Sequence, residues 1–395
     1  MSCAGKIVLV RADLNVPVQD GRITDTLRID RLWPTVKELA AAGAKVVLLS
    51  HFERPKGKPD PRLSLRPIAA QMSDLWQRPV AFAEDCVGPV AKAAIDALPW
   101  GGVLVLENTR FHPGEEPDDS AFAGQLAALG DIFVNDAFSA SHRANASTCG
   151  VARYLPALAG RSLQVELQTL DKALEHPARP VAAIVGGAKI SSKLDLLHNI
   201  VGKTDLLVLG GAMANTFLAA QGVAIGASRF EADMLDAARA IMATAAQRQC
   251  RILLPLDVVV AEALAAGVAA QTVDVAAIPA DKMILDVGPK SVAAILDQLA
   301  NCRTVVWNGP LGVFEIPPFD QGTTAVAQGV AALTQRGALL SVAGGGDTAA
   351  ALAHAGVIDR IGYLSTGGGA FLEWLEGKDL PAIAALKNAR KKTAA

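Results

Sequence analysis

The feature that most constrains the fold is a regular alternation of short β-branched runs with amphipathic helical patterns. In the first half, these runs lie at residues 6–10, 46–49, 103–106 and 132–134. They are apolar at successive positions, which is typical of parallel strands covered by helices on both faces. The sequence therefore predicts α/β domains, in which ligands bind beyond the carboxyl ends of the strands.

The alternation starts again at Pro180, with runs at residues 181–185, 206–209, 252–254, 304–307, 339–342 and 362–364. Between the halves, residues 162–175 carry leucines at three- or four-residue spacing and predict a bridging helix, which is also the candidate hinge. We expect two Rossmann-like domains, each a parallel sheet with helices on both faces. The first spans residues 1–175 and the second residues 176–377, and the tail from about residue 378 to 395 is a candidate to return to the first.

Composition excludes several classes of protein. The 395 residues are 51% hydrophobic and 19% charged, which excludes a disordered chain. The formal net charge of −2 gives no overall field that would attract nucleic acid or anionic lipid. No stretch predicts an export signal or a membrane helix, and the five cysteines lack a C-x-x-C pair, which indicates reduced thiols. We expect a cytoplasmic protein with no nucleic-acid or membrane partner.

Basic residues recur after the predicted strands of the first half. The strand ends deliver Arg11 to Asn15, Ser50 to Arg54, Glu107 to His112, and Asn135 to Arg143, and Arg28 lies at the start of the helix that follows the Gly21 turn. Asp13 and Asn15 flank one apolar residue, so an extended strand would point both side chains one way. Any single arginine is well explained by an ion pair with a neighbouring carboxylate. Their repetition at one structural level favours a site for a small polyanion.

Glycine clusters follow the strands of the second half. They are Gly186-Gly187, Gly210-Gly211, Gly344-Gly345-Gly346 and Gly367-Gly368-Gly369. Glycine between a strand and a helix lets phosphate oxygens approach backbone N–H groups and the positive end of the helix. Tight turn geometry or helix packing is the better explanation of any one cluster, but the set predicts a polyphosphate site.

A dinucleotide site is a rival interpretation, because Gly344-x-Gly346-x-x-Ala349 satisfies the relaxed fingerprint G-x-G-x-x-G/A. Against it, Asp347 would place a carboxylate beside the pyrophosphate. A carboxylate at that point better suits a Mg²⁺ bridge to phosphates. Lys189 and Lys193 stand four apart after a glycine turn, so a helix that starts there would place both on one face. The segment from Trp307 to Glu315 offers apolar surface for a base, and Glu315 could accept ribose hydroxyls.

Taken in order, the motifs resemble those of the phosphoglycerate kinase family over essentially the whole chain. They are Asp13-Leu-Asn15-Val-Pro17, Ser50-His51-x-x-Arg54-Pro55, Glu107-Asn-x-Arg110-Phe111, Asn135-Asp-Ala-Phe138, His142-Arg143-Ala, Gly186-Gly-Ala-Lys189, Trp307-Asn-Gly-Pro310, Gly344-Gly-Gly-Asp347-Thr348 and Ser365-Thr-Gly-Gly-Gly369. The resemblance implies reversible transfer of the acyl phosphate of 1,3-bisphosphoglycerate to Mg-ADP, which gives 3-phosphoglycerate and ATP in glycolysis. It also implies a monomer.

The resemblance also implies roles for individual residues. Phosphoglycerate would be held by Asp13, Asn15, Arg28, His51, Arg54, Arg110 and Arg143. The nucleotide would be held by Gly187, Lys193, Gly211, Asn308, Pro310, Glu315, Gly346, Asp347 and Thr348, with Asp347 on the magnesium ion. The residues implied to act in catalysis are Arg28, Lys189, Gly345 and Gly368, of which Arg28 and Lys189 would stabilise charge in the transition state.

This chain departs from the family pattern at a few positions. Where the family usually reads Ser-His-Leu-Gly-Arg-Pro, this chain has Phe52 and Glu53, which places an acid next to Arg54. Asn145 stands where a second histidine is common, Ser139 replaces a frequent glycine, and Ser192 stands where some members have Asp. Two other functions stay open at this point: an NAD-dependent oxidoreductase and a non-enzymatic, hinge-closing protein that binds anions.

Overall fold

The computed structural model describes residues 2–394, with the side chains described up to residue 389. The chain forms two compact units. One comprises the residues up to Leu167 together with those from Asp379, and the other is Gln168–Lys378. The division lies within the segment for which the sequence predicts a bridging helix. That segment contains helix α5 (Arg161–Leu170), which continues into a π-helical turn, Asp171–Glu175.

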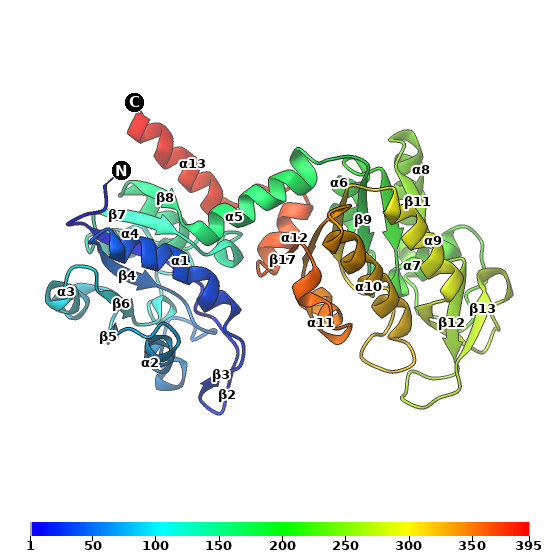
Figure 1. The fold of residues 1–395 in the computed structure, drawn as a ribbon, viewed down its shortest axis with the longest axis horizontal. Coiled ribbons are helices and arrows are strands. Elements are labelled where there is room, and N and C mark those ends of the chain that lie inside the picture. The colour runs from blue at the N-terminus through cyan, green and yellow to red at the C-terminus, as the bar shows by residue number, and fades with distance from the viewer. Residues whose placement is uncertain (1, 395) are drawn as a thin grey trace. The chain divides into compact units, whose positions relative to one another are not determined.

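The first unit is built on six parallel strands. They are β1 (Ile7–Arg11), β4 (Lys45–Leu49), β5 (Val80–Ala83), β6 (Val103–Leu106), β7 (Ile132–Asn135) and β8 (Ala157–Ala159), in the spatial order β5-β6-β4-β1-β7-β8. The helices of this unit are α1 (Leu27–Ala41), α2 (Arg66–Leu75), α3 (Gly88–Ala97), α4 (Ser120–Ala127) and the C-terminal α13 (Pro381–Ala394), drawn in red in Figure 1. A two-stranded hairpin, β2 (Val18–Gln19) and β3 (Arg22–Ile23), precedes α1.

Burial on both faces explains why these runs form strands of a covered parallel sheet. Val8 and Val10 of β1 lie in one core cluster with Ile29 of α1 and Met72 of α2. Leu9, which points to the opposite face of the same strand, is also fully buried. Covering both faces leaves the carboxyl ends of the strands, with their polar loops, as the place where a ligand can reach the sheet.

The second unit has its own six-stranded parallel sheet. The strands are β9 (Val181–Val185), β10 (Leu206–Leu209), β11 (Arg251–Leu253), β15 (Thr304–Asn308), β16 (Leu340–Gly344) and β17 (Tyr363–Ser365), in the order β11-β10-β9-β15-β16-β17. Its helices are α6 (Leu194–Val201), α7 (Gly211–Ala220), α8 (Leu235–Gln247), α9 (Pro289–Ala300), α10 (Gln321–Gln335), α11 (Gly346–His354) and α12 (Gly369–Leu375). Both units thus have the predicted architecture of a parallel sheet with flanking helices (Figure 1).

A three-stranded antiparallel sheet in the second unit was not predicted. It consists of β12 (Asp257–Ala261), β13 (Gln271–Asp274) and β14 (Met283–Val287), with β12 in the centre. β13 is polar and mostly exposed, so it lacks the apolar run that marks the other strands. The sequence prediction also omitted β5 and β8, which are short edge strands with exposed positions.

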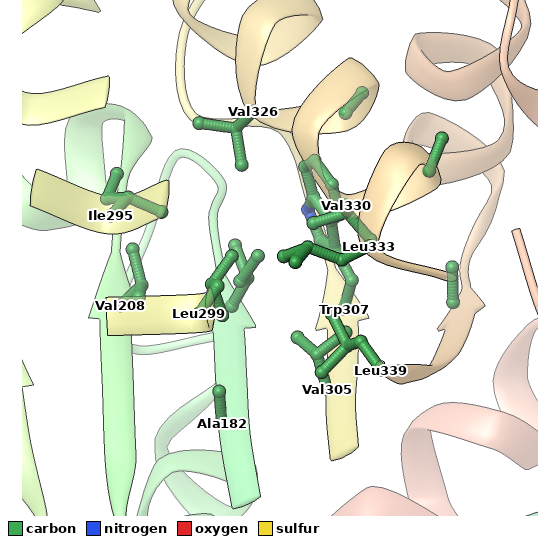
Figure 2. Packing of buried hydrophobic residues seen from close by; sticks show 14 of the residues in the cluster. Ala182, Val208, Ile295, Leu299, Val305, Trp307, Val326, Val330, Leu333 and Leu339 are labelled. Carbon is green, nitrogen blue, oxygen red and sulfur yellow. The ribbon is translucent and has the colours of Figure 1, made fainter. Parts of the chain in front are cut away.

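The core of the second unit contains Trp307, which the sequence prediction had offered as a surface for a base. Figure 2 shows its ring beside Val330 and Leu333 of α10, and the residue is 2% exposed. The indole Nε1 donates a hydrogen bond to Gly309 O at 2.8 Å. Trp307 is therefore a core residue that fixes the loop after β15, and that part of the prediction was wrong.

Among the described residues, no helix combines the length and the apolar character needed to span a bilayer. All five cysteines are free.

Candidate functional site

In the first unit, the neighbouring strands β6, β4, β1 and β7 end in the polar loops that carry the predicted anion-binding residues. β1 ends at Arg11, so Asp13 and Asn15 lie in the loop beyond it rather than on the extended strand that the sequence predicted. Asp13 Oδ1 accepts a hydrogen bond from Asn15 N at 3.1 Å, which turns the chain. The loop is attached to the next strand end through Leu14 N, which donates to Ser50 Oγ at 2.9 Å.

Arg28, in the first turn of α1, reaches back to this loop. Its Nη1 lies 2.9 Å from Asp13 Oδ2 and donates to Asn15 O at 2.7 Å. Ser139 Oγ also donates to Asp13 Oδ2. The guanidinium is thereby oriented from one side, while 31% of the Arg28 side chain stays exposed to solvent. An oriented and accessible guanidinium can donate a fork of hydrogen bonds to an anion.

His51 lies among arginines. Burial and the positive charges of Arg11, Arg110, Arg143 and Arg28 lower the pKa of His51 well below its usual range. Arg11 Nη2 is 2.9 Å from His51 Nδ1, and a guanidinium can only donate, so Nδ1 accepts and the neutral ring carries its proton on Nε2. His51 is thus a neutral N–H donor within a positive field, which suits an anionic ligand.

Arg11 is one of the basic residues at the predicted strand ends, but the family resemblance gives it no role in the site. It is 1% exposed, and its Nε donates to Ser147 Oγ at 2.8 Å. Burial lowers its pKa, although Glu115 and Asp13 favour the charged form. The sequence signal for Arg11 is its position: it is the last residue of a buried strand and comes directly before the loop that carries Asp13 and Asn15.

The backbone of Glu53 connects Asn15 with Arg110. Its N–H donates to Asn15 Oδ1 at 2.9 Å, and its carbonyl accepts from Arg110 Nη1 at 2.7 Å. Its φ of +52° lies in the left-handed region that favours glycine. Its side chain is exposed, as is that of Arg54, whose charge acts on Arg110. Arg143 is half-buried, and its Nε donates to His142 Nε2 at 3.1 Å.

In the second unit, three strand-end loops pack so closely that only glycine fits at their contacts. Gly186 N donates to Asn308 O at 2.9 Å, and Gly211 N donates to Leu311 O at 2.7 Å. A Cβ on Gly211, whose φ is +68°, would lie 2.6 Å from Gly187 O. The glycine pairs therefore bring β9, β10 and β15 to one tightly packed edge.

Lys193 ties these loops together. Its Nζ donates to Gly186 O at 2.6 Å and to Asn308 Oδ1 at 2.7 Å, and Asn308 Nδ2 donates in turn to Gly344 O at 2.8 Å. Burial lowers the pKa of Lys193 to about 8, and the negative charge of Asp347 partly opposes this shift. The ammonium is thus a half-buried, hydrogen-bonded charge at the glycine edge.

Thr348 and Gly345 complete this network at the start of α11. Thr348 Oγ1 donates to Gly344 O and accepts from Gly309 N, at 2.8 and 2.7 Å. Gly345 is the N-cap of α11 with φ +100°, and a Cβ there would lie 2.7 Å from Asn308 Nδ2. Gly346 follows at the first helical position, and Gly368 is the N-cap of α12. Helix starts thus follow β16 and β17, as the glycine clusters predicted.

Lys189 differs from Lys193 in its surroundings. It is exposed, and α6 begins only at Leu194, so the two lysines do not share a helical face and that prediction was wrong. Burial raises the pKa of Glu231, but hydrogen bonds from Ser191 and the nearby charge of Lys189 outweigh this and lower it. Lys189 thus lies on the accessible side of the loop.

A cavity of about 490 Å³ opens beside the glycine edge. Of the predicted nucleotide residues, it is lined by Gly187, Gly211, Pro310, Glu315 and Asp347, whereas Lys193, Asn308, Gly346 and Thr348 lie outside its lining. Its apolar wall comes from Leu311 and Val313 and from the small antiparallel sheet, through Met283 and Leu285. The cavity therefore combines glycine turns, an apolar wall and four carboxylates, those of Glu262, Asp286, Glu315 and Asp347.

Asp286, on β14, also lines this cavity and was missed by the sequence prediction. Burial raises its pKa to about 7, although the N–H groups of Gly322 and Val287 donate to it at 2.7 and 2.9 Å. It binds the start of α10 to β14, which keeps the cavity wall in place. The sequence signal that could have identified Asp286 is a carboxylate within the otherwise apolar run Met283–Val287.

Comparison with known proteins identifies the family. Residues 1–378 match the family model for phosphoglycerate kinase. The chain belongs to the phosphoglycerate kinase family. Members of this family are phosphotransferases, so the chain is an enzyme of this kind. The match excludes the oxidoreductase and the non-enzymatic binding protein that the sequence motifs alone left open.

Relatives and solved structures agree with this family. The chain is 62% identical to the phosphoglycerate kinase of Rhodospirillum centenum over 386 residues, which cover 98% of each chain. It is 59% identical to that of Sinorhizobium medicae over 387 residues, covering 98% of this chain and 97% of the relative. The structure of phosphoglycerate kinase from Coxiella burnetii superposes with a TM-score of 0.91 at 43% identity, covering 98% of this chain and 97% of the other.

Proposed function

We propose that this phosphoglycerate kinase family member transfers the acyl phosphate of 1,3-bisphosphoglycerate reversibly to Mg-ADP, giving 3-phosphoglycerate and ATP. The observation that carries the proposal is the neutral His51 among four arginines at the strand ends of the first unit. Such a site attracts a small polyanion and can hold both its carboxylate and its phosphate. 3-Phosphoglycerate carries one carboxylate and one phosphate, so it matches a site of this kind.

On the phosphoglycerate side, we assign binding to the residues that the strand ends bring together. They are Asp13, Asn15, Arg28, His51, Arg54, Arg110 and Arg143. Asp13 and Asn15 act by orienting Arg28 and the Glu53 backbone, as their hydrogen bonds show. Arg54 is exposed and would act mainly through its charge.

On the nucleotide side, we assign the cavity of the second unit to ADP and ATP. Its apolar wall suits the base and Glu315 the ribose hydroxyls, while the glycine turns with Lys193 suit the phosphates. Asp347 fits a magnesium ion, because its carboxylate lies on the cavity wall in the first turn of α11, and Mg²⁺ binds through one or two carboxylates plus phosphate oxygens. Bound there with the nucleotide, Mg²⁺ would neutralise phosphate charge.

Phosphoryl transfer needs little covalent help from the protein, because it depends on in-line positioning and on neutralising charge on the equatorial oxygens. We assign this neutralisation to Arg28 and Lys189, with N–H groups near Gly345 and Gly368 as further donors. The acyl phosphate must also be kept from water, so we propose hinge closure about α5 during turnover.

The free cysteines agree with a cytoplasmic protein, and we propose a monomer.

The proposal is tested by turnover of Mg-ATP and 3-phosphoglycerate, followed as ADP release from the purified protein. We expect turnover that requires all three components, and Asp347→Asn should lose most of it while binding of 3-phosphoglycerate persists. A folded protein that binds 3-phosphoglycerate but shows no turnover would overturn the proposal. So would full activity without Mg²⁺.

Glu53→Gly is expected to improve both stability and substrate affinity. Glycine adopts the left-handed φ of Glu53 without a clash of the Cβ, so the substitution should stabilise the fold by about 1 kcal/mol. Removal of the carboxylate beside Arg54 should lower KM for 3-phosphoglycerate about two- to fivefold, as expected for an exposed charge worth up to about 1 kcal/mol. Urea denaturation and steady-state kinetics measure the two effects.

Two control variants separate these effects. Lys56 is also exposed with a left-handed φ of +57°, so Lys56→Gly should give the gain in stability without the fall in KM. Glu53→Gln should lower KM without the gain in stability. A KM that is unchanged in both Glu53 variants would show that its carboxylate does not affect the substrate.

A further inference from the structure

The first unit contains a cluster of three potential metal ligands that the proposed reaction does not use. Asp85 and Cys86 follow strand β5, and His112 follows the short 3-10 turn Thr109–Phe111 after β6. β5 and β6 are parallel neighbours, with Ala83 opposite Leu106, so their carboxyl ends lie side by side. This pairing brings one oxygen, one sulfur and one nitrogen within 4.8 Å of one another.

The three side chains are held in place from different sides. His112 Nε2 lies 2.7 Å from Asp85 Oδ1, and the His112 ring stacks on Phe122 with centroids 4.9 Å apart. Cys86 is fully buried, whereas the side chains of Asp85 and His112 are 39% and 29% exposed. The cluster thus has a closed side at the thiol and an accessible side at the carboxylate and imidazole.

The accessible side opens into a second cavity of about 490 Å³. Asp85 and His112 line it, together with Asp60, Glu84 and Glu107. Arg66 lines the cavity too and pairs with Glu84, so an incoming cation would meet both this ion pair and the carboxylates of Asp60 and Glu107. The cavity also leaves space next to Asp85 and His112 for a fourth ligand, such as a water molecule.

The donor set identifies the class of metal. Mg²⁺ and Ca²⁺ take oxygen ligands, whereas a thiolate with an imidazole suits Zn²⁺ and similar transition metals. Three protein ligands with one open position form the usual accessible zinc arrangement. We propose that Asp85, Cys86 and His112 bind a divalent transition metal of the zinc class, with the remaining coordination position facing the cavity.

Binding requires only local rearrangement. Zinc bonds of about 2.0–2.3 Å place tetrahedral ligand atoms roughly 3.5 Å apart. The Asp85–His112 contact of 2.7 Å must therefore widen, while the thiol already lies within 4.8 Å of both atoms. The thiol releases its proton to solvent as the metal–sulfur bond forms, and the Asp85–His112 hydrogen bond is replaced by two metal bonds. His112 caps the turn that contains Arg110, so a bound metal should also stabilise this turn.

Cobalt provides a direct test, because Co²⁺ reports a tetrahedral thiolate site by absorption. The chelator-treated full-length protein is titrated with Co²⁺ alone, and then with Zn²⁺ as competitor. We expect one equivalent of Co²⁺ to give a thiolate charge-transfer band, which Zn²⁺ abolishes. Cys86→Ser should remove the band, and His112→Gln should weaken Co²⁺ binding by at least tenfold.

Matched controls use residues of the same types outside the cluster. Cys302→Ser changes another buried thiol and His176→Gln an exposed histidine, and both should leave the titration unchanged. Absence of the band in the unaltered protein, or a band that survives Cys86→Ser and His112→Gln, would overturn the proposal. If Cys86→Ser fails to fold, His112→Gln, at a partly exposed position, decides the question. The readout is independent of kinase turnover.

Discussion

Arg28→Ala is expected to lower kcat by about 10²–10³-fold, the usual cost of removing one donor that stabilises charge in a transition state. Arg28 is oriented by Asp13 and by Asn15 O, and about a third of its side chain is accessible. Its contribution should appear mainly in the chemical step, because charge on the transferring phosphoryl group is greatest there. Steady-state kinetics with Mg-ATP and 3-phosphoglycerate measure the effect.

Three further variants make this prediction specific. Arg28→Lys keeps the charge but loses the fork geometry, so it should recover only part of kcat. Arg54→Ala removes an exposed charge and should mainly raise KM for 3-phosphoglycerate. Arg22→Ala, on the exposed hairpin strand β3, should change neither constant. Equal changes in kcat and KM for Arg28→Ala and Arg54→Ala would contradict the division of roles.

The parallel sheets could be predicted from the sequence because their strands are buried on both faces. Runs such as Val181–Val185 are then apolar at every position, and their short length and β-branched residues favour a buried strand over a helix. The small antiparallel sheet could not be predicted in this way. Its pairing of Val258 with Val287 joins residues far apart in the chain, and its strand β13 is polar. Such pairing depends on tertiary packing, which periodicity does not report.

The location of the site followed from one physical rule, that ligands bind at the carboxyl ends of parallel strands. The rule selects positions such as His51 and Gly187 but does not give the contacts of each side chain. It did not show that Lys193 points back to Gly186 O, or that Glu53 adopts a left-handed φ. These features depend on how neighbouring loops pack, and that is determined only when the fold is complete.

Lys193→Met is expected to raise Kd for ADP about 100-fold. The Lys193 ammonium donates to Gly186 O and to Asn308 Oδ1, so its removal leaves acceptors in the glycine edge without their donor. It also removes the positive charge that we assign to phosphate binding. A charged hydrogen bond contributes about 1.5–3 kcal/mol, and about 2.7 kcal/mol corresponds to 100-fold. Isothermal titration calorimetry with ADP measures the change.

The same residue predicts a pH dependence of nucleotide binding. Burial lowers the pKa of Lys193 to about 8 in the free protein, and a bound phosphate would raise it. At a pH between these two pKa values, the Lys193 amine is neutral in the free protein and takes up a proton when ADP binds. Affinity for ADP should therefore fall as pH rises above about 8, by at most tenfold per pH unit.

Lys193→Met should remove this dependence, whereas Lys189→Met should keep it, because Lys189 is exposed at the same loop. Lys189→Met should instead lower kcat. If ADP affinity in the unaltered protein stays constant up to about pH 10, the ammonium does not face the phosphates, since bound phosphate would otherwise have shifted its titration. Lys193 would then act only by holding the three loops together, and Lys193→Met would weaken binding equally at every pH.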